Sequence, residues 1–310
     1  MMANVKRDIK NSGRTHVLAD MSLCGKKMEG KIIKGVGGQY TVDTQKGLFV
    51  CNARGLFRKK KLVPLVGDLV YVKVEGVSCT LTDILPRVNE LHRPRVANVD
   101  QVMIVLAAAQ PDLHFTMLDR YLLLTEYENI LTAICVNKED LNEDIPAEVR
   151  EMYESIGYDV FVVSCVRGTG LDDIDEFLRG KTTVLAGPSG TGKSSVINCI
   201  TKGEHKTGPV SKKIGRGKHT TRHAELIPIA PAGYVIDTPG FSSLNPPDVP
   251  VGDRAALFRE FRPFLGQCKF RDCLHQSEKD CAIKDQIGKS INPIRYERYK
   301  EYLTQGDSHV

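Results

Sequence analysis

The chain has 310 residues, of which 41% are hydrophobic and 26% are charged, and its formal net charge is +5. At ~100–200 residues per domain, this length and composition predict a soluble protein of two or three domains. No segment approaches the ~18–20 apolar residues of a membrane helix, and residues 1–10 lack the apolar core of a signal peptide. We therefore expect a cytoplasmic protein without a membrane partner.

The nine cysteines are expected to be thiols or metal ligands. A chain of this length without an export signal is typical of a reducing compartment, not of a disulfide scaffold. Three of the cysteines cluster near the C-terminus. The other six are scattered and are predicted to be core residues: Cys24, Cys51, Cys79, Cys135, Cys165 and Cys199.

Residues 1–20 are polar and basic, which predicts a flexible tail. The next segment, residues 21–88, contains short β-rich runs with glycine-containing turns between them. About five strands at this spacing predict a small β-barrel, with an OB-fold as the first choice and an SH3-like barrel as the alternative. The runs are residues 31–36, 40–44, 48–52, 69–74 and 79–84.

After a predicted linker at residues 86–95, strand-like and helix-like segments alternate. This alternation predicts right-handed βαβ units and a mostly parallel sheet with helices on both faces, over residues 89–248. Residues 249–310 are charged and are predicted to be helical. The strand candidates are residues 101–108, 131–136, 159–163 and 182–186, and the helix candidates are residues 117–127, 148–156 and 171–177.

A phosphate-binding loop follows the last of these strands. Residues 187–194 match the pattern G-x-x-x-x-G-K-S, and a helix-like run comes directly after them. In such a loop the backbone amides surround the β-phosphate, while Lys193 would bridge the β- and γ-phosphates and Ser194 would bind Mg²⁺. The predicted contacts are Gly187, Pro188, Ser189, Gly190, Thr191, Gly192, Lys193, Ser194 and Ser195.

The residues that would read the base lie upstream of this loop. Asn137, Lys138, Glu139 and Asp140 match the N-K-x-D signature of guanine recognition, and they follow a predicted strand. The carboxylate of Asp140 can accept from N1–H and N2–H₂ of guanine, and adenine lacks the second donor, so we expect discrimination between the two bases. The remaining base-contacting loop is predicted at Ser164 and Cys165, with the Cys165 amide near guanine O6.

A third motif lies downstream, where residues 237–240 read D-T-P-G and fit D-x-x-G. Asp237 would support the Mg²⁺ shell, and the amide of Gly240 would sense the γ-phosphate. An ordinary GTPase places N-K-x-D last, whereas here it precedes the phosphate loop. This order predicts a circularly permuted GTPase domain.

The group that would assist hydrolysis is expected between the phosphate loop and D-T-P-G. Thr221 is the first choice for the threonine that closes on Mg²⁺, and Thr220 is the second. Ras-like enzymes carry a water-orienting glutamine just after D-x-x-G, but Phe241 stands there and cannot orient water. His219 could position or activate the attacking water instead. The alternative is that His219 is an ordinary loop residue.

The C-terminal cysteines form a metal-binding pattern. Cys268, Cys273, His275 and Cys281 have the spacing C-x4-C-x-H-x5-C. Three thiolates and one imidazole complete a closed tetrahedral site, which structural Zn²⁺ prefers. A redox-sensitive thiol cluster is the alternative.

With these motifs together, the chain resembles the bacterial family of small-subunit-dependent GTPases of the RsgA or YjeQ type. The resemblance covers nearly the whole chain, including G-V-G-G-Q-Y at residues 35–40, A-R-G at residues 53–55 and G-x-G-K-H-T-T-R at residues 215–222. It implies an N-terminal OB-fold, a circularly permuted GTPase domain and a C-terminal helical zinc domain. On its pattern, His219 is the catalytic histidine and Thr221 the switch threonine.

The resemblance also implies the partners. These are GTP and GDP, the 30S ribosomal subunit and 16S rRNA, and hydrolysis stimulated by that particle late in its maturation; we expect a monomer. Gly190 stands where some potassium-activated GTPases carry an asparagine, so the sequence gives no support for potassium dependence.

Two other functions are compatible with parts of the sequence. One is an RNA-binding module in which nucleotide is structural, because the basic residues 58–61 and 212–222 suit a polyanion, although such runs are equally typical of solvated loops. The other is a phosphate-loop kinase or ATPase, which Asn137 and Asp140 disfavour.

Overall fold

The computed structural model describes residues 25–53, 57, 62–76, 78–92, 95–201, 224–229, 232–237 and 247–304. The chain divides into two compact units, each assembled from separate stretches of sequence. None of the helices among the described residues is long and apolar enough to cross a bilayer. The first unit contains Met1–Gln101, Gly168–Ala186 and Gly192–Phe241, and the second contains Val102–Arg167, Gly187–Thr191 and Ser242–Val310.

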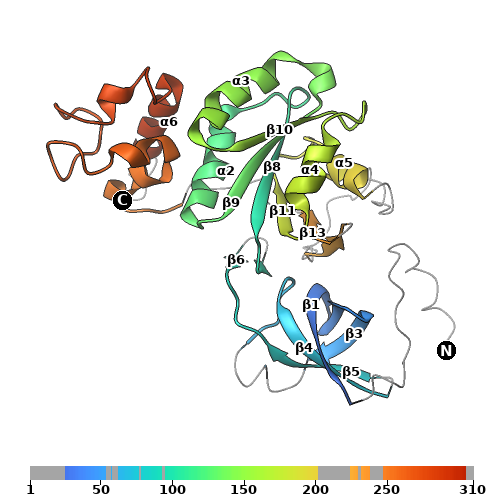
Figure 1. The fold of residues 1–310 in the computed structure, drawn as a ribbon. Helices are drawn as coiled ribbons and strands as arrows, with labels where there is room; N and C mark the ends of the chain where they lie inside the picture. Colours follow the sequence, from blue (N-terminus) through green and yellow to red (C-terminus); the bar gives the residue numbers. More distant parts are fainter. Residues whose placement is uncertain are drawn as a thin grey trace, which may run out of the picture. The chain divides into compact units, whose positions relative to one another are not determined.

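In the first unit, five strands form a closed barrel in the order β1-β2-β3-β5-β4 (Figure 1). The predicted barrel is therefore confirmed, and this order, closed by a parallel contact between β3 and β5, fits the OB-fold. The alternating side chains of Ile32, Val42, Val70, Val72 and Leu81 fill its interior. The strands are β1 (Lys27–Val36), β2 (Gln39–Thr44), β3 (Gly47–Ala53), β4 (Leu69–Glu75) and β5 (Ser78–Ile84).

Two barrel cysteines correct the expectation of thiols. Cys51 and Cys79 are buried, as predicted, but they form a disulfide with their Cα atoms 4.4 Å apart. Composition could not reveal this pairing, because it results from β3 and β5 being neighbouring strands of the barrel. Cys135 is buried with a free thiol, Cys165 and Cys199 are half-buried, and Cys24 lies outside the described residues.

The predicted linker contains structure. Two short strands, β6 (Glu90–His92) and β7 (Arg95–Ala97), pair as an antiparallel ribbon. The Asn89 side chain closes the end of this ribbon at which Glu90 pairs with Ala97. It accepts from the Val99 amide at 2.9 Å and donates to the Val99 carbonyl at 2.8 Å. Three-residue strands are too short to produce a readable alternation of polar and apolar residues, so the sequence did not indicate them.

The remaining strands form a six-stranded sheet in the order β10-β9-β8-β11-β13-β12. The contacts of β9 with β10 and of β11 with β13 are parallel, as predicted, whereas β12 is an antiparallel edge strand that was not predicted. Every residue of β8 is buried, as is usual for strands covered on both faces. The strands are β8 (Gln101–Ala107), β9 (Leu131–Asn137), β10 (Asp159–Val163), β11 (Thr182–Ala186), β12 (Leu226–Pro228) and β13 (Tyr234–Asp237).

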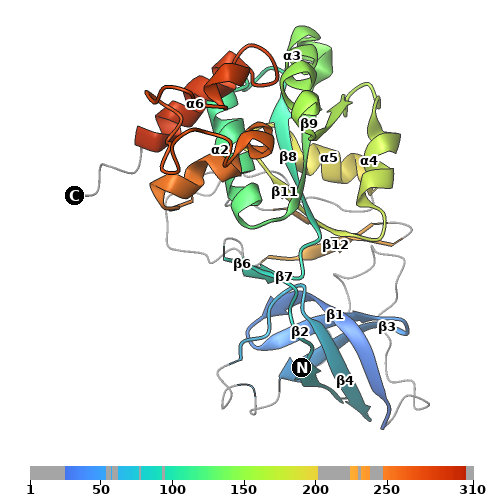
Figure 2. The same ribbon diagram turned by 60° about the vertical axis from the view of Figure 1, so that its left-hand side comes forward.

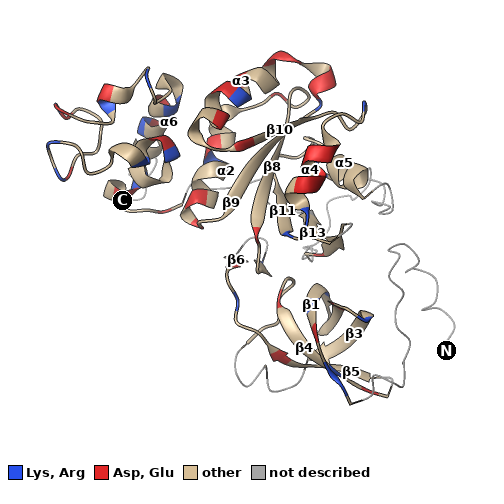
Figure 3. Cartoon of the chain, in the orientation of Figure 1, with Lys and Arg blue, Asp and Glu red and all other residues tan. Residues whose placement is uncertain are grey.

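Four helices accompany these strands, and each matches a predicted helical run. They differ in charge: α4 begins with Asp172 and Asp173 in its first turn, where carboxylates complement the helix dipole, and it stands out as acidic in Figure 3. The helices are α2 (Phe115–Tyr127), α3 (Asp144–Tyr153), α4 (Leu171–Leu178) and α5 (Lys193–Ile200).

The C-terminal module, defined as residues 247–304, belongs to the second unit and lies beside α2 (Figure 2). Its core is aromatic: the ring of Tyr299 meets Phe258 edge-on at 5.3 Å and Phe261 at 5.0 Å between centroids. The described part of the module contains one α-helix and three 3₁₀ helices. They are η4 (Val251–Leu257), η5 (Arg259–Phe264), η6 (Lys284–Gln286) and α6 (Pro293–Thr304). Of these, η6 contributes no buried residue to the core.

A buried charge network attaches this module to α2. The guanidinium of Arg295 is 1% exposed and binds both Asp119 of α2 and Glu260, the latter at 2.7 Å. Arg298 and the hydroxyl of Tyr153 also donate to Asp119, at 2.7 and 2.6 Å. Burial opposes the charge of Arg295, but the two carboxylates outweigh it and raise the pKa of this arginine.

A second carboxylate of α2 repeats the arrangement. Glu126 accepts from Arg259 and from Arg262, each at 2.6 Å, and from the hydroxyl of Tyr158 at 2.9 Å. Arg259 also lies over the Tyr158 ring, 3.8 Å from its centroid. The module is thus held to one face of α2 by arginines, none of which the sequence had marked for this role.

Replacing Asp119 by alanine is predicted to lower the free energy of unfolding by about 3 kcal/mol, because breaking a buried pair leaves Arg295 short of a carboxylate. Chemical denaturation would measure the change. The matched control is Arg150→Ala, which removes the exposed pair of Arg150 with Glu154 and should cost less than about 0.5 kcal/mol. Equal small effects of the two substitutions would contradict this account of the network.

Candidate nucleotide-binding site and metal cluster

The phosphate loop turns sharply where β11 ends. Gly187 has a φ of 127°, and a Cβ atom there would lie 2.1 Å from the carbonyl oxygen of Val105 in β8. Only glycine permits both this backbone conformation and this approach. Farther along, the hydroxyl of Thr191 donates to the carbonyl of Pro188 at 3.0 Å, and Gly192 caps α5. Lys193, Ser194 and Ser195 form the first turn of that helix.

The structure brings the base-reading motif against this loop. Asn137 is the last residue of β9, and its side-chain amide donates to the carbonyl of Thr191 at 3.0 Å. The ammonium of Lys138 donates to the carbonyl of Gly190 at 2.8 Å and also to that of Gln110. Because these bonds fix the side chains of both residues, they set the distance between the place for the base and the place for the phosphates.

Asp140 is held by the loop of Ser164 and Cys165, the other loop predicted to contact the base. Ser164 is fully buried, and its hydroxyl donates to Asp140 at 2.5 Å. The Cys165 amide points to the side-chain oxygen of Asn137 at 3.5 Å, a long contact. A carboxylate has about four acceptor sites, so Asp140 can bind Ser164 and still accept from a base. Glu139 lies next to Asp140 in the short helix η2 (Glu139–Leu141).

The sequence reasoning missed a pocket beside the phosphate loop. Residues 111–114, from the connection between β8 and α2, form one wall of it, and the loop forms another. This connection belongs to the site, because the carbonyl of Gln110 accepts from Lys138. Nothing in its sequence indicates that role. The lining includes Pro111, Leu113, His114, Met117, Pro188 and Ser189.

Several predicted site residues cannot be located by the structure. Asp237 ends β13, but its side chain is not described. Gly240, Phe241, His219, Thr220 and Thr221 lie outside the described residues, as do both basic clusters. All the predicted Mg²⁺ ligands, Ser194 included, and the group that assists hydrolysis therefore stay predictions.

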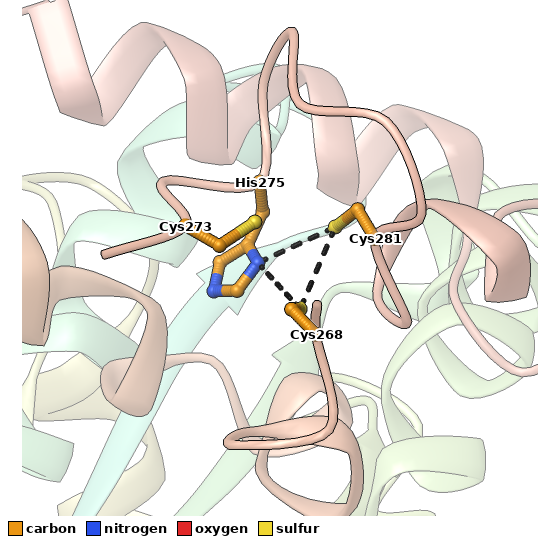
Figure 4. Close-up of side chains that lie close together, drawn as sticks. All are labelled: Cys268, Cys273, His275 and Cys281. Atoms are coloured by element: carbon orange, nitrogen blue, oxygen red, sulfur yellow. Dashed lines mark hydrogen bonds between the residues drawn. The ribbon is translucent and has the colours of Figure 1, made fainter. Parts of the chain in front are cut away.

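The four predicted metal ligands come together in the C-terminal module (Figure 4). The sulfurs of Cys268 and Cys281 lie 3.5 and 3.4 Å from Nδ1 of His275 and 3.8 Å from each other. A tetrahedral zinc-sized site would have sulfur–sulfur edges of about 3.8 Å and sulfur–nitrogen edges of about 3.6 Å. The fourth ligand atom, from Cys273, lies within 4.8 Å of the others. The donors thus fit a single metal ion.

Neighbouring groups hold the ligand loop in place. From α6, the hydroxyls of Tyr296 and Tyr299 donate to the carbonyls of His275 and Leu274 at 2.6 and 2.9 Å. Burial raises the pKa of the Cys273 thiol to about 12 and lowers the pKa of His275. Without a cation the Cys273 thiol would thus be protonated near neutral pH, and metal binding would release its proton.

Comparison with known proteins agrees with this geometry. The family model of the RsgA N-terminal domain matches residues 29–78, and that of the RsgA GTPase matches residues 84–246. A protein of Clostridium beijerinckii, named small ribosomal subunit biogenesis GTPase RsgA, is 45% identical over 284 residues, which are 90% of this chain and 97% of that protein. This chain belongs to the RsgA family.

Other RsgA proteins and two solved structures support the assignment. An Alkaliphilus metalliredigens protein of the same name is 46% identical over 89% of this chain and 95% of its own. The crystal structure of YjeQ from Thermotoga maritima has a TM-score of 0.79 and 32% identity, covering 92% of this chain and 100% of that one. That of YloQ, described as a circularly permuted GTPase, has a TM-score of 0.77 and 38% identity, covering 92% and 96%.

As a member of the RsgA family, this chain is a GTPase. The prediction of a circularly permuted domain is confirmed as well, since β9 with Asn137 precedes β11 and the phosphate loop in the chain. The arrangement of Asn137 and Lys138 against the phosphate loop is the candidate site for its nucleotide.

The close approach at Gly187 yields a test. Gly187→Ala should weaken binding of a fluorescent GTP analogue at least about tenfold, because its Cβ would displace the loop from Val105. Gly168→Ala is the control: Gly168 also has a positive φ, of 74°, but no atom lies within 4 Å of its added Cβ. Unchanged binding by Gly187→Ala would show that the loop does not need this approach.

Proposed function

We propose that this chain acts late in maturation of the small ribosomal subunit, binds the 30S particle through 16S rRNA, and hydrolyses GTP faster when bound to it. The observation that carries the proposal is the pair of hydrogen bonds from Asn137 and Lys138 to the phosphate loop, which join a guanine-specific motif to a triphosphate site. The partner comes from the relatives, whose names specify small ribosomal subunit biogenesis. The chain would act in the cytoplasm as a monomer.

Within the site, we assign recognition of guanine to Asp140, positioned by Ser164, and to the amide of Cys165. The bond of 2.5 Å from Ser164 supports this role, because it orients a carboxylate that must meet two N–H groups of the base. Asn137 and Lys138 connect this part to the phosphates. Binding of GDP should use the same contacts, since they do not reach the γ-phosphate.

For hydrolysis, we assign the roles by motif. Lys193 would neutralise charge between the β- and γ-phosphates, and Ser194 with Thr221 would bind Mg²⁺, supported by Asp237. The amide of Gly240 would sense the γ-phosphate, and His219 would position the attacking water. The position of Lys193 and Ser194 in the first turn of α5, directly after the phosphate loop, supports their part of this scheme.

For the metal cluster, we propose one structural Zn²⁺ bound by Cys268, Cys273, His275 and Cys281. Three soft sulfurs and an imidazole nitrogen at tetrahedral spacing favour zinc and leave no open position for a catalytic water. The proposed domains are the barrel over residues 21–88, the GTPase domain over residues 89–248 and the zinc domain over residues 249–310, which corresponds to the C-terminal module.

GTP hydrolysis by the purified protein, alone and with 30S, 50S or 70S particles, tests the function. We expect strong stimulation by 30S particles alone. Lys193→Ala should abolish hydrolysis with every particle, because the γ-phosphate loses its lysine, and should retain affinity for RNA. Equal rates of hydrolysis with and without particles would be consistent with a GTPase but would refute the ribosomal role. If Lys193→Ala supported 30S maturation in full, the nucleotide would be structural and the chain an RNA-binding module.

The zinc assignment has its own test. Mass spectrometry of the purified protein should find one zinc per chain, and Cys273→Ser should lose it, with a lower melting temperature that a chelator reproduces in the wild type. Cys199→Ser, at a half-buried cysteine outside the cluster, should retain the metal. A full complement of zinc in Cys273→Ser would exclude this ligand set.

A further inference from the structure

In the first unit, a polar junction connects the barrel with two strands of the sheet. Lys31 and Asp43 are register partners in β1 and β2, so their side chains leave the barrel on the same side. Thr182 and Tyr234 are register partners at the beginnings of β11 and β13. The two pairs bind each other: Lys31 donates to the hydroxyl of Thr182 at 2.8 Å, and the hydroxyl of Tyr234 donates to Asp43 at 2.8 Å.

The acceptors of this junction are buried, and its donors, Lys31 and Tyr234, are half-buried. Asp43 is 4% exposed and Thr182 is 1% exposed, and the ammonium of Lys31 lies 5.2 Å from the centre of the Tyr234 ring. Asp100 fixes the start of β11, because its carboxylate accepts from the Thr182 amide at 2.7 Å. Burial lowers the pKa of Lys31, and Asp100 opposes this shift. Since an unpaired polar group here would be costly, barrel and strands are held in one arrangement.

A second barrel contact nearby is of a different kind. Lys34 of β1 and Glu225, just before β12, form an ion pair at 2.9 Å, but both side chains are about half exposed. Exposed pairs are screened by solvent and restrain their partners weakly. The two contacts therefore provide a comparison between a part-buried and an exposed connection of the barrel to the same sheet.

The strands that start at the junction end at the nucleotide motifs. β11 runs from Thr182 to Ala186 and enters the phosphate loop, and β13 runs from Tyr234 to Asp237 of D-x-x-G. At ~3.3 Å per residue, the loop begins about 17 Å from Thr182, and Asp237 lies about 10 Å from Tyr234. Each motif is thus connected to the junction with the barrel by its own short strand: β11 for the phosphate loop and β13 for D-x-x-G.

We propose that Tyr234 is a positioning residue: its hydrogen bond to Asp43 couples the barrel to Asp237 and the phosphate loop, so that RNA bound on the barrel accelerates hydrolysis. This inference rests on the proposed stimulation by the 30S particle. The coupling requires that the barrel and the strand beginnings move together, and the bond between Asp43 and Tyr234 joins the beginning of β13 to β2 of the barrel.

The test compares four variants with the wild type. Tyr234→Phe keeps the ring over Lys31 and removes the donor to Asp43, so its hydrolysis without ribosomes should stay within about twofold of the wild type. With saturating 30S particles, its kcat should fall about fivefold or more, a typical size for coupling between sites, while KM for GTP and affinity for 30S stay unchanged.

The other three variants separate the bond from general structure. Asp43→Ala should behave like Tyr234→Phe, and Asp43→Asn should retain stimulation, because its amide oxygen still accepts from the hydroxyl. Lys34→Gln, at the exposed pair, should match the wild type. Thermal unfolding would establish that all four are folded.

The outcomes are distinct. If 30S particles stimulated hydrolysis by Tyr234→Phe as strongly as hydrolysis by the wild type, the coupling would be overturned and the proposed function would stand. If Tyr234→Phe lowered the basal and the stimulated rates of hydrolysis by the same factor, Tyr234 would have a merely structural role, and the coupling would again be overturned. Absence of stimulation in the wild type would refute the proposed function, and the coupling with it.

Discussion

The contact of Asn137 and Lys138 with the phosphate loop is the interaction on which the site depends. Asn137, at the end of β9, and Lys138, directly after it, donate to backbone carbonyls of the loop. In the proposed site these bonds would fix the base relative to its phosphates. Carbonyl acceptors suit this purpose, because the loop amides can then point toward the phosphates. The arrangement needs β9 and β11 to end at the same edge of a sheet, and it does not depend on which strand comes first in the chain.

Circular permutation is tolerated for that reason. Parallel strands direct their carboxyl ends to one edge, so the motifs meet whether the base-reading half is encoded first or last. What the permutation changes is what each end of the domain is joined to. The barrel precedes β8, and the C-terminal module follows D-x-x-G. The nucleotide motifs therefore lie, in the chain, between the barrel and the C-terminal module.

The features that the sequence predicted well are local ones. The barrel strands, the parallel strands and the phosphate loop follow from periodicity and from glycine at Gly187, and the metal cluster follows from four ligands within fourteen residues. The missed features are pairings between distant residues. Cys51 with Cys79 depends on how the barrel closes, Tyr234 with Asp43 spans 191 positions, and the edge strand β12 is too short to show a pattern.

The charge network on α2 has a consequence for synthesis of the protein. Asp119 precedes its partner Arg295 by 176 residues. At ~5–20 residues per second, a ribosome needs roughly 10–35 s to translate that interval. Throughout this time Asp119, Glu126 and the apolar Leu123 of α2 lack the module that covers them. Folding of the second unit can therefore be completed only after α6 has left the exit tunnel.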